Sequence, residues 1–315
     1  MASPILGLHH VTATVADAQT DLDYCLNALG LRLVKKTVNF DNHHVYHFYY
    51  GDEQGTPGTI WTTFPYWGRG VPVGTKGTGQ VTTTSFSVPA DSLDFWRARL
   101  RALKLGPQDA PPRFSEESIL VTDPSGLFME LVANDRDARA PWTAGGIAAD
   151  AAIRGLHSVT MTLASPPATI AFMQQFLGFT VVNEMAGRTR LCVNGDQPGK
   201  TMEIVHAPDA VRAKNGLGTV HHVAMAVATA DEQLRLREEL VRAGVGVTEV
   251  RDRQYFQSIY FREPGGVLFE VATMQPGFAV DEKPDALGRA LKLPSWEEPH
   301  RSAIESGLDP VSYRS

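Results

Sequence analysis

The stretch Gly7-Leu-His-His-Val-Thr12 is the first of four related segments in the chain. The other three are Gln80-Val-Thr-Thr-Thr-Ser85, Gly155-Leu-His-Ser-Val-Thr160 and Thr219-Val-His-His-Val-Ala224. Each segment begins an alternating or β-branched run that is typical of a strand. Internal repetition of this kind indicates that one supersecondary unit is used four times.

A helical pattern follows each of these predicted strands. Apolar residues recur there at spacings of three and four, which keeps them on one face of a helix. Each pattern then reaches a glycine, the residue best suited to the left-handed conformation that closes a helix. These four glycines are Gly30, Gly106, Gly178 and Gly244.

Strand-like stretches and turns complete each unit, as in Asp123-Pro-Ser-Gly126 and Glu263-Pro-Gly-Gly266, which both lead into apolar runs. Such turn chemistry is typical of hairpins. The predicted fold is therefore α+β and consists of four βαβββ modules, followed by a tail that packs along the surface. Within the tail, Ser302-Ala-Ile-Glu305 predicts a capping box at the start of a short helix. The predicted ranges are 5–65, 79–134, 153–207 and 217–274 for modules one to four, 135–152 for a linker and 275–315 for the C-terminal tail.

Composition restricts the partners and the compartment of the chain. Its 315 residues are 43% hydrophobic and 20% charged, which is typical of a globular protein, and the formal net charge is −6. An acidic chain repels phosphate backbones and anionic lipid surfaces, so neither nucleic acid nor a membrane is an expected partner. Without a signal-like N-terminus or a long apolar run, the expected location is cytoplasmic. The two cysteines, Cys25 and Cys192, are too few for a disulfide framework and are expected to be buried, small apolar residues.

With these motifs, the chain resembles the vicinal oxygen chelate superfamily (glyoxalase/bleomycin resistance/dioxygenase), in which βαβββ modules pair into open barrels around a metal. The resemblance covers nearly all of residues 5–274. Within the superfamily, the chain is most similar to the four-module ring-cleaving dioxygenases, a group that includes dichlorohydroquinone dioxygenase. The shared motifs are Leu8-His-His-Val-Thr12, Gly55-Thr-Pro-Gly58, Val220-His-His-Val223, Pro264-Gly-Gly-Val-Leu-Phe-Glu270 and, in the tail, residues 293–301.

The register of the repeats predicts a metal site independently of this resemblance. The second position of the opening pair holds His10, Thr83, Ser158 and His222, and the last strand of each module holds Trp61 or Thr62, Glu130, Glu203 and Glu270. Two histidines and one carboxylate form the facial triad of non-haem Fe(II) oxygenases. Only the pairing of module one with module four collects such a set, namely His10, His222 and Glu270. Modules one and four are therefore predicted to share a metal-binding barrel and modules two and three to form a metal-free barrel, with hydrogen-bonded structural roles for Glu130 and Glu203.

The first histidine of each pair, His9 or His221, has a different predicted role, because neighbouring side chains of a strand face opposite sides. Module three keeps His157 at this position beside Ser158, which favours His10 and His222 as the ligands. His9 and His221 are then structural, or they support the ligands. At least one of His43, His44 and His47 could face the cavity, although hydrogen-bonded or solvated strand histidines are the ordinary alternative.

The resemblance implies further site residues and a reaction. Thr12, Arg253 and Tyr260, together with His9 and His221, match positions that handle protons or stabilise oxyanion charge beside the metal. The implied cofactor is Fe(II), with Mn(II) as the alternative. The implied partners are O2 and a small aromatic substrate, a hydroquinone or a catechol, with Trp61 or Phe256 as a wall of the pocket.

Two other classes of function are compatible with the same superfamily. A glyoxalase-like isomerase or lyase would use Zn or Ni and a ligand from the last strand of both modules, but Thr59-Ile-Trp-Thr-Thr-Phe64 contains no acid. A drug-binding protein without enzymatic activity would need no triad. The sequence leaves a homo-oligomer open.

Overall fold

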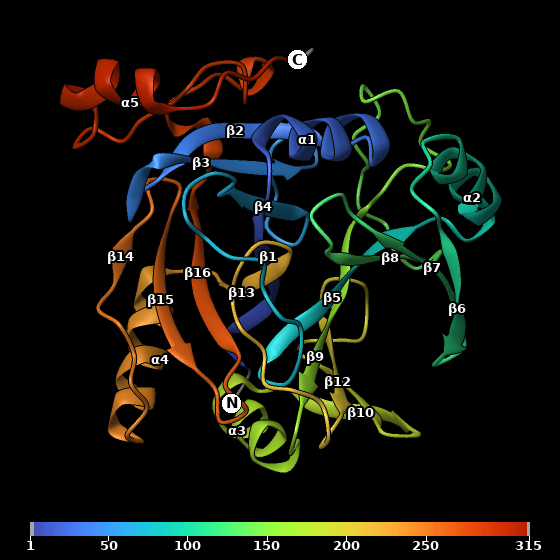
Figure 1. Ribbon diagram of the computed structural model, residues 1–315. Helices are drawn as coiled ribbons and strands as arrows, with labels where there is room; N and C mark the ends of the chain where they lie inside the picture. The colour runs from blue at the N-terminus through green and yellow to red at the C-terminus, as the bar shows by residue number, and fades with distance from the viewer. Residues whose placement is uncertain (1–2, 314–315) are drawn as a thin grey trace.

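The computed structural model describes residues 3–313 of the 315-residue chain. Its strands form two eight-stranded sheets, which are curled into open barrels that lie side by side (Figure 1). Four consecutive parts of the chain each contribute a strand, a helix and three further strands, in that order. The predicted α+β fold of four βαβββ modules in two barrels is confirmed.

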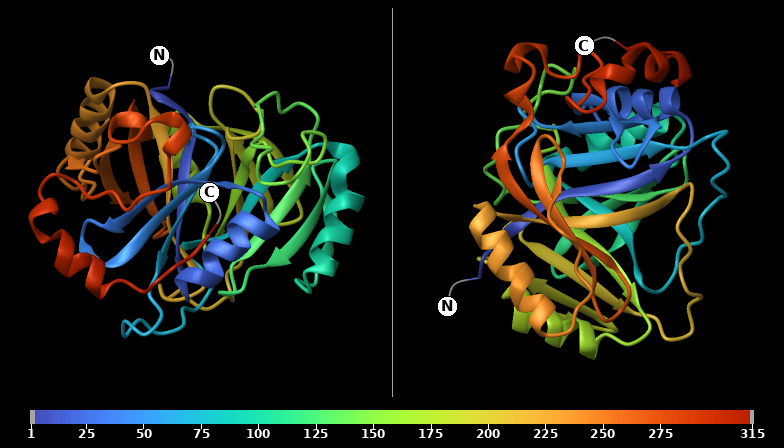
Figure 2. Two further views of the ribbon diagram at one scale, coloured as in Figure 1. Left: turned by 90° about the horizontal axis from the view of Figure 1, so that it is seen from above. Right: turned by 90° about the vertical axis from the view of Figure 1, so that its left-hand side faces the viewer.

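The first barrel joins the beginning of the chain to the fourth module. Along its sheet, the strand order is β14-β15-β16-β13-β1-β4-β3-β2, so β1 and β13 meet at the centre. Figure 2 shows these two parts of the chain, blue and orange, side by side in one barrel. The pairing of modules one and four is therefore as predicted. The strands are β1 (Ile5–Val15), β2 (Arg32–Asn39), β3 (Asn42–Gly51) and β4 (Ile60–Pro65) from module one, and β13 (Thr219–Val227), β14 (Arg251–Asp252), β15 (Phe256–Arg262) and β16 (Leu268–Pro276) from module four.

The second barrel is built in the same way from the two middle modules. Its strand order is β10-β11-β12-β9-β5-β8-β7-β6. In every module the first strand runs parallel to the last, and the two modules of a barrel meet through their first strands, which are antiparallel. The strands are β5 (Gln80–Val88), β6 (Gln108–Arg113), β7 (Glu116–Thr122) and β8 (Phe128–Ala133), then β9 (Gly155–Leu163), β10 (Thr180–Met185), β11 (Arg188–Cys192) and β12 (Thr201–His206).

One helix follows the first strand of each module, and the four expected glycines come after these helices with positive φ angles of 69°, 58°, 69° and 82°. In module two the prediction of a closing glycine is wrong, because α2 ends before Leu103 and Lys104, with a φ of 59°, is the left-handed residue that follows. A capping box lies in the fourth module, where Thr229 and Glu232 bond reciprocally. Both cysteines are buried and free, as expected. Within residues 3–313, no helix is long and apolar enough to cross a membrane. The helices are α1 (Ala18–Asp23), extended by a π-helical turn (Tyr24–Ala28), α2 (Leu93–Ala102), preceded by a 3-10 turn (Ala90–Ser92), α3 (Pro167–Leu177) and α4 (Ala230–Arg242).

The C-terminal tail lies over the outer strands of module one, as the red segment of Figure 1 shows. Buried Lys35 on β2 fastens it through ion pairs with Asp281, at 2.5 Å, and with Glu282. The predicted capping box is wrong, because helix α5 (Arg301–Gly307) begins before Ser302 and its N-cap residue makes no side-chain hydrogen bond. The remaining tail elements are 3-10 turns at Phe278–Val280, Pro284–Ala286 and Glu298–His300.

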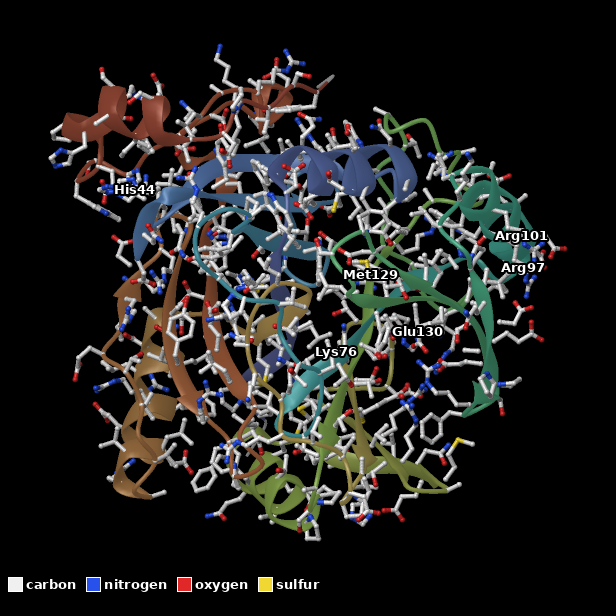
Figure 3. All side chains as sticks on the ribbon, in the orientation of Figure 1. His44, Lys76, Arg97, Arg101, Met129 and Glu130 are labelled. Carbon is white, nitrogen blue, oxygen red and sulfur yellow. The ribbon has the colours of Figure 1, made fainter. Side chains whose placement is uncertain are left out.

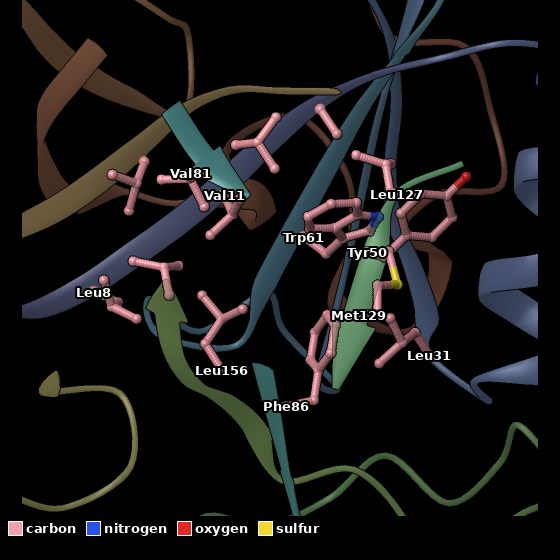
Figure 4. Close-up of a cluster of buried hydrophobic side chains, with 14 of the residues drawn as sticks. Leu8, Val11, Leu31, Tyr50, Trp61, Val81, Phe86, Leu127, Met129 and Leu156 are labelled. Carbon is pink, nitrogen blue, oxygen red and sulfur yellow. The ribbon is translucent and has the colours of Figure 1, made fainter. Parts of the chain in front are cut away.

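An apolar core fills the space between the two barrels (Figure 4). Trp61 of β4 lies in this core and packs edge to face on Phe86 of β5, with ring centroids 6.2 Å apart. Because β4 alternates sides, Trp61 points away from the interior of the first barrel while Thr62 points into it. The prediction of Trp61 as a pocket wall is therefore wrong.

Two carboxyl groups are buried at the edge of this core. Asp21 accepts hydrogen bonds from Tyr50 at 2.7 Å and Thr63 at 2.6 Å, and Asp123 accepts one from the backbone N–H of Leu127 at 2.6 Å. Burial raises the pKa of Asp21 to about 6 and that of Asp123 to about 7. In both cases desolvation outweighs the hydrogen bonds that favour the charged form.

The raised pKa of Asp123 predicts a pH-dependent effect of Asp123→Asn. Between pH 4 and 7 the folded state keeps a proton that the unfolded state has lost, so stability from this group falls as the pH rises through that window. One pKa unit is worth about 1.4 kcal/mol. The free energy of unfolding of the variant, relative to that of the parent, should therefore rise by about 4 kcal/mol between pH 4 and 8. Urea unfolding at several pH values measures this difference directly. A constant difference would contradict the assignment, and Asp94→Asn, at a 94% exposed side chain, is the control.

Candidate metal centre

Three buried side chains from three strands converge inside the first barrel. The Nε2 atoms of His10 on β1 and His222 on β13 are 3.3 Å apart, and Oε2 of Glu270 on β16 lies 3.3 Å from the first and 2.8 Å from the second. All three residues are at most 5% exposed. The structure thus brings together the three residues predicted as metal ligands.

Strand register explains why these side chains meet. The antiparallel pairing of β1 with β13 sets Thr12 opposite His222 and His10 opposite Ala224. The parallel pairing of β13 with β16 then sets Ala224 beside Glu270. Both histidines and the glutamate therefore point into the barrel at one level, although more than 200 residues separate His10 from His222.

The donor atoms of this cluster suit a divalent cation. Ser258 donates a hydrogen bond to Oε1 of Glu270, while Oε2 faces the Nε2 atoms of His10 and His222. Burial alone would raise the pKa of Glu270, yet the neighbouring His10 and His222 keep it well below its usual value. A buried carboxylate oxygen and two imidazole nitrogens that face one centre are a suitable set of ligands for a cation. Two histidines and one carboxylate suit Fe(II) with open coordination positions.

His9 and His221 support the two converging histidines in the same way. Nδ1 of His9 lies 2.9 Å from Nδ1 of His10, and Nδ1 of His221 lies 2.7 Å from Nδ1 of His222. Burial lowers the pKa of His9 and of His221 to about 3, so both rings are neutral and can accept a hydrogen bond. An imidazole that binds a cation through Nε2 carries its proton on Nδ1 and donates it to a neighbour. The two outer histidines are placed to receive that bond.

Thr62 occupies the position in module one that Glu270 occupies in module four. Thr62 pairs with Thr12, two residues after His10, just as Glu270 pairs with Ala224, two residues after His222. The sequence left Trp61 and Thr62 as alternatives for this position, and the register selects Thr62. The barrel therefore offers three charged or imidazole ligands and a neutral hydroxyl where a fourth ligand would lie.

Arg253 and Tyr260 lie beside this cluster. The ring of Tyr260 is 5.7 Å from that of His222, and Nε of Arg253 donates a hydrogen bond of 3.1 Å to the Tyr260 hydroxyl. Asp41, on the hairpin between β2 and β3, accepts a bond of 2.9 Å from Arg253. Burial raises the pKa of Tyr260, so the phenol stays protonated and can act as a donor.

Thr12 and His47 are joined through Thr62 on the opposite side of the cluster. The Thr62 hydroxyl donates to Oγ1 of Thr12 at 2.9 Å, and Nε2 of His47 lies 2.9 Å from the same Thr62 oxygen. The sequence singled out a group of three histidines here but did not choose among them. Of these, His47 lines the cavity, His43 pairs with Glu297 of the tail at 3.0 Å, and His44 lies at the outer end of β3 (Figure 3).

A cavity of about 260 Å³ opens onto the cluster. Phe256 forms one wall of this cavity, and its ring lies 5.2 Å from that of His10. Of the two aromatic residues predicted as a pocket wall, Trp61 and Phe256, the structure places Phe256 there. The volume lies near the lower end of ligand pockets, roughly 300 to 1,000 Å³, which favours a substrate with one ring. Besides the three residues of the cluster, its polar lining includes Asn39, Asp41, His47, Tyr66, Arg253 and Tyr260.

In the second barrel, Thr83 and Ser158 stand at the positions of His10 and His222, and arginines from β6 and β11 lie beside the glutamates of the last strands. Arg113 donates to both terminal-strand glutamates, Glu130 at 3.1 Å and Glu203 at 3.0 Å, and is only 6% exposed. Arg190 adds a bond of 2.6 Å to Glu203. Figure 3 labels Glu130 within this barrel. Protein cations thus neutralise Glu130 and Glu203, which agrees with the structural roles expected for them.

Comparison with known proteins identifies the class of protein. The family model described as "Glyoxalase/Bleomycin resistance protein/Dioxygenase superfamily" matches residues 155–271. Together with full-length relatives at 40% identity, this match shows that the chain belongs to this superfamily. The resemblance predicted from the histidine motifs is confirmed.

Individual relatives carry more specific names than the superfamily. A protein of Bacillus subtilis (strain 168) named "Putative ring-cleaving dioxygenase MhqO" is 40% identical over 314 residues, with 100% of this chain and 99% of the relative covered. The "Chlorohydroquinone/hydroquinone 1,2-dioxygenase" of Sphingobium indicum is 34% identical over 314 residues, with 97% of each covered. A crystal structure of a "putative dioxygenase" from Bacillus subtilis superposes with a TM-score of 0.94 at 40% identity over 100% of both chains. Glyoxalase I from Zea mays shares the fold, with a TM-score of 0.62 at 14% identity over 85% of this chain and 92% of that one.

Proposed function

We propose that this protein is a ring-cleaving dioxygenase that holds one Fe(II) between His10, His222 and Glu270 and inserts O2 into a hydroquinone- or catechol-type ring. The observation that carries the proposal is the convergence of three buried donor atoms in a barrel whose fourth ligand position holds only Thr62. Relatives at 34–41% identity carry names of ring-cleaving dioxygenases, one of them a hydroquinone 1,2-dioxygenase, which supports the same reaction class.

Each site residue has a role in this proposal. The iron, when bound, supplies a Lewis acid for a phenolate oxygen and the redox partner that O2 requires. Tyr260, a buried phenol bonded to Arg253, can donate a hydrogen bond to negative charge that develops on oxygen. His9 and His221 fix the orientation of the ligands, and Phe256 limits access of water to the centre.

A glyoxalase-like isomerase or lyase remains the second candidate within the superfamily. It would take a ligand from the last strand of both modules, whereas Thr62 provides no carboxylate. A drug-binding protein is disfavoured because it would have no need of a buried carboxylate facing two histidines.

Oxygen uptake tests the proposed function. The protein is reconstituted with Fe(II) under anaerobic conditions and then mixed with O2 and a panel of hydroquinones and catechols. Consumption of one O2 per substrate in at least one of the two classes is the expected result. No uptake with either class, at full iron occupancy, would move the assignment to the isomerase or lyase.

Replacement of Thr62 by glutamate tests the open coordination position. A carboxylate at this position should complete a four-ligand site, so Thr62→Glu is expected to retain metal more firmly and to lose roughly a hundredfold in O2 uptake, about 2.7 kcal/mol. Metal retention during dialysis and O2 uptake are measured together. Thr62→Val, which removes the hydroxyl without adding a ligand, is the control for loss of the hydrogen bonds. Unchanged O2 uptake by Thr62→Glu would contradict the assignment.

A further inference from the structure

Residues 293–301 of the tail form a motif that has no part in the proposed function. The lining of the cavity over the cluster does not include them. Two of them, Trp296 and Glu297, contact the hairpin between β2 and β3 instead. The ring of Trp296 packs edge to face on that of Phe40, with centroids 5.7 Å apart, and Glu297 pairs with His43 at 3.0 Å.

The turn of this hairpin forms part of the rim of the cavity. Asn39, Phe40 and Asp41 are consecutive, and all three line the cavity. Asn39 is buried and Phe40 is half-buried, whereas the side chain of Asp41 is 55% exposed. The turn therefore passes from the inside of the cavity to the solvent, and its position sets how widely the cavity opens.

Module four contacts the same turn through Asp41. Oδ1 of Asp41 accepts a hydrogen bond of 3.1 Å from Arg251, and Oδ2 accepts one of 2.9 Å from Arg253. Arg253 also donates to the hydroxyl of Tyr260, which lines the cavity as well. The turn is thus tied both to the tail and to a polar group of the cavity wall.

Backbone pairing alone holds this turn weakly. β2 and β3 pair as far as Val38 and Tyr46, but the register then shifts and Asn39 pairs with Asn42. Residues 43–45 of β3 are passed over by this shift, and an irregularity of this kind disrupts the ladder locally. The end of the hairpin therefore depends on side-chain contacts, and those made by the tail come from outside the two barrels.

We infer that Trp296 and Glu297 are positioning residues, which hold the β2–β3 turn closed over the cavity and thereby raise the affinity for a phenolic ligand. This inference rests on the proposed function, which places the aromatic substrate in this cavity. A ligand that touches Phe40 and Asp41 binds only the closed turn. Its apparent affinity therefore falls in proportion to the fraction of molecules in which the turn is closed.

Equilibrium binding without O2 tests the inference separately from catalysis. The Fe(II)-loaded protein is titrated anaerobically with hydroquinone and with catechol. The loss of one edge-to-face aromatic pair predicts that Trp296→Ala binds both phenols roughly fivefold more weakly, with unchanged metal content. Trp296→Phe keeps an aromatic partner for Phe40 and should recover most of the affinity. In O2 uptake, the KM of Trp296→Ala should rise by the same factor, whereas kcat should stay at the parental value.

Hydrogen exchange provides a second measurement, which needs no ligand. The amides of residues 39–46 should exchange roughly fivefold faster in Trp296→Ala, because the turn opens more often, while those of β13 and β16 should exchange as in the parent. Trp142→Ala is the matched control. It removes a tryptophan that contacts Arg32 at the other end of β2, and it should change neither the exchange of the turn nor the affinity for the phenols.

The contrary outcomes separate this inference from the proposed function. If Trp296→Ala does not fold, Glu297→Gln is the second test, because it removes only the ion pair with His43 and should weaken binding about twofold. Equal affinities in the parent and in these variants, or a parent that binds neither phenol, would overturn the inference. Trp296-dependent binding in a protein that consumes no O2 would leave the inference standing and refute the proposed function. O2 uptake with a KM that does not depend on Trp296 would refute the inference alone.

Discussion

Glu270→Gln is expected to abolish metal binding and O2 uptake while the fold persists. The substitution keeps the size of the side chain and can still accept from Ser258, but it removes the anionic charge between His10 and His222. A cation in a buried site loses several kcal/mol of charge stabilisation when its carboxylate ligand is neutralised. We expect metal content below a tenth of the parental value and a loss of roughly a thousandfold in O2 uptake, about 4 kcal/mol.

Metal analysis after gel filtration and an O2 electrode measure the two effects of this change. Glu203→Gln, at the equivalent strand position in the second barrel, is the matched control and should keep both metal and activity. Retention of one metal per chain by Glu270→Gln would show that this carboxylate is not a ligand.

Arg113→Ala is expected to cause the largest loss of stability. Arg113 lies between Glu130 and Glu203 in the second barrel, and its removal leaves Glu130 buried without a cation, with only a bond of 2.8 Å from Ser85. Breaking a buried ion pair by removing one partner costs about 3–5 kcal/mol. The expected measurement is a decrease of that size in the free energy of unfolding in urea.

Two further variants separate this effect from a simple loss of arginine contacts. Arg97→Ala removes a half-buried arginine that pairs with the exposed Asp94 and Asp109 on the surface of the same module (Figure 3), and surface pairs are worth about 0–1 kcal/mol. The double change Arg113→Ala and Glu130→Gln removes the unpaired charge and should recover part of the stability. A loss in Arg113→Ala no greater than that in Arg97→Ala would contradict the role of the buried network.

The pairing of the barrels was accessible from sequence, because it follows from which repeats carry histidine. Only modules one and four have histidine at the second position of the opening pair. Only a barrel that joins these two modules collects His10, His222 and Glu270. The structure adopts this pairing through β1 and β13. The closing glycines of modules one, three and four were predictable for a local reason, since a left-handed residue ends each of these helices, whereas Lys104 takes that position in module two.

Some roles could not be predicted from the sequence, because they depend on side-chain direction and on long-range contacts. A shift of one residue in register exchanges Trp61 with Thr62, and only the paired strands show that Trp61 enters the core between the barrels. Arg113 follows two prolines at the end of an exposed strand, and nothing in its local sequence indicates that it reaches two glutamates of different modules. The choice of His47 among three neighbouring histidines required the position of Thr62.

Anomalous diffraction at the iron edge, from crystals of the Fe(II)-loaded protein, tests the central claim most directly. We expect one strong peak per chain, within coordination distance of Nε2 of His10, Nε2 of His222 and Oε2 of Glu270, and no peak at Arg113 in the second barrel. A peak elsewhere in the chain, or none at these three atoms in protein that contains stoichiometric iron, would contradict it.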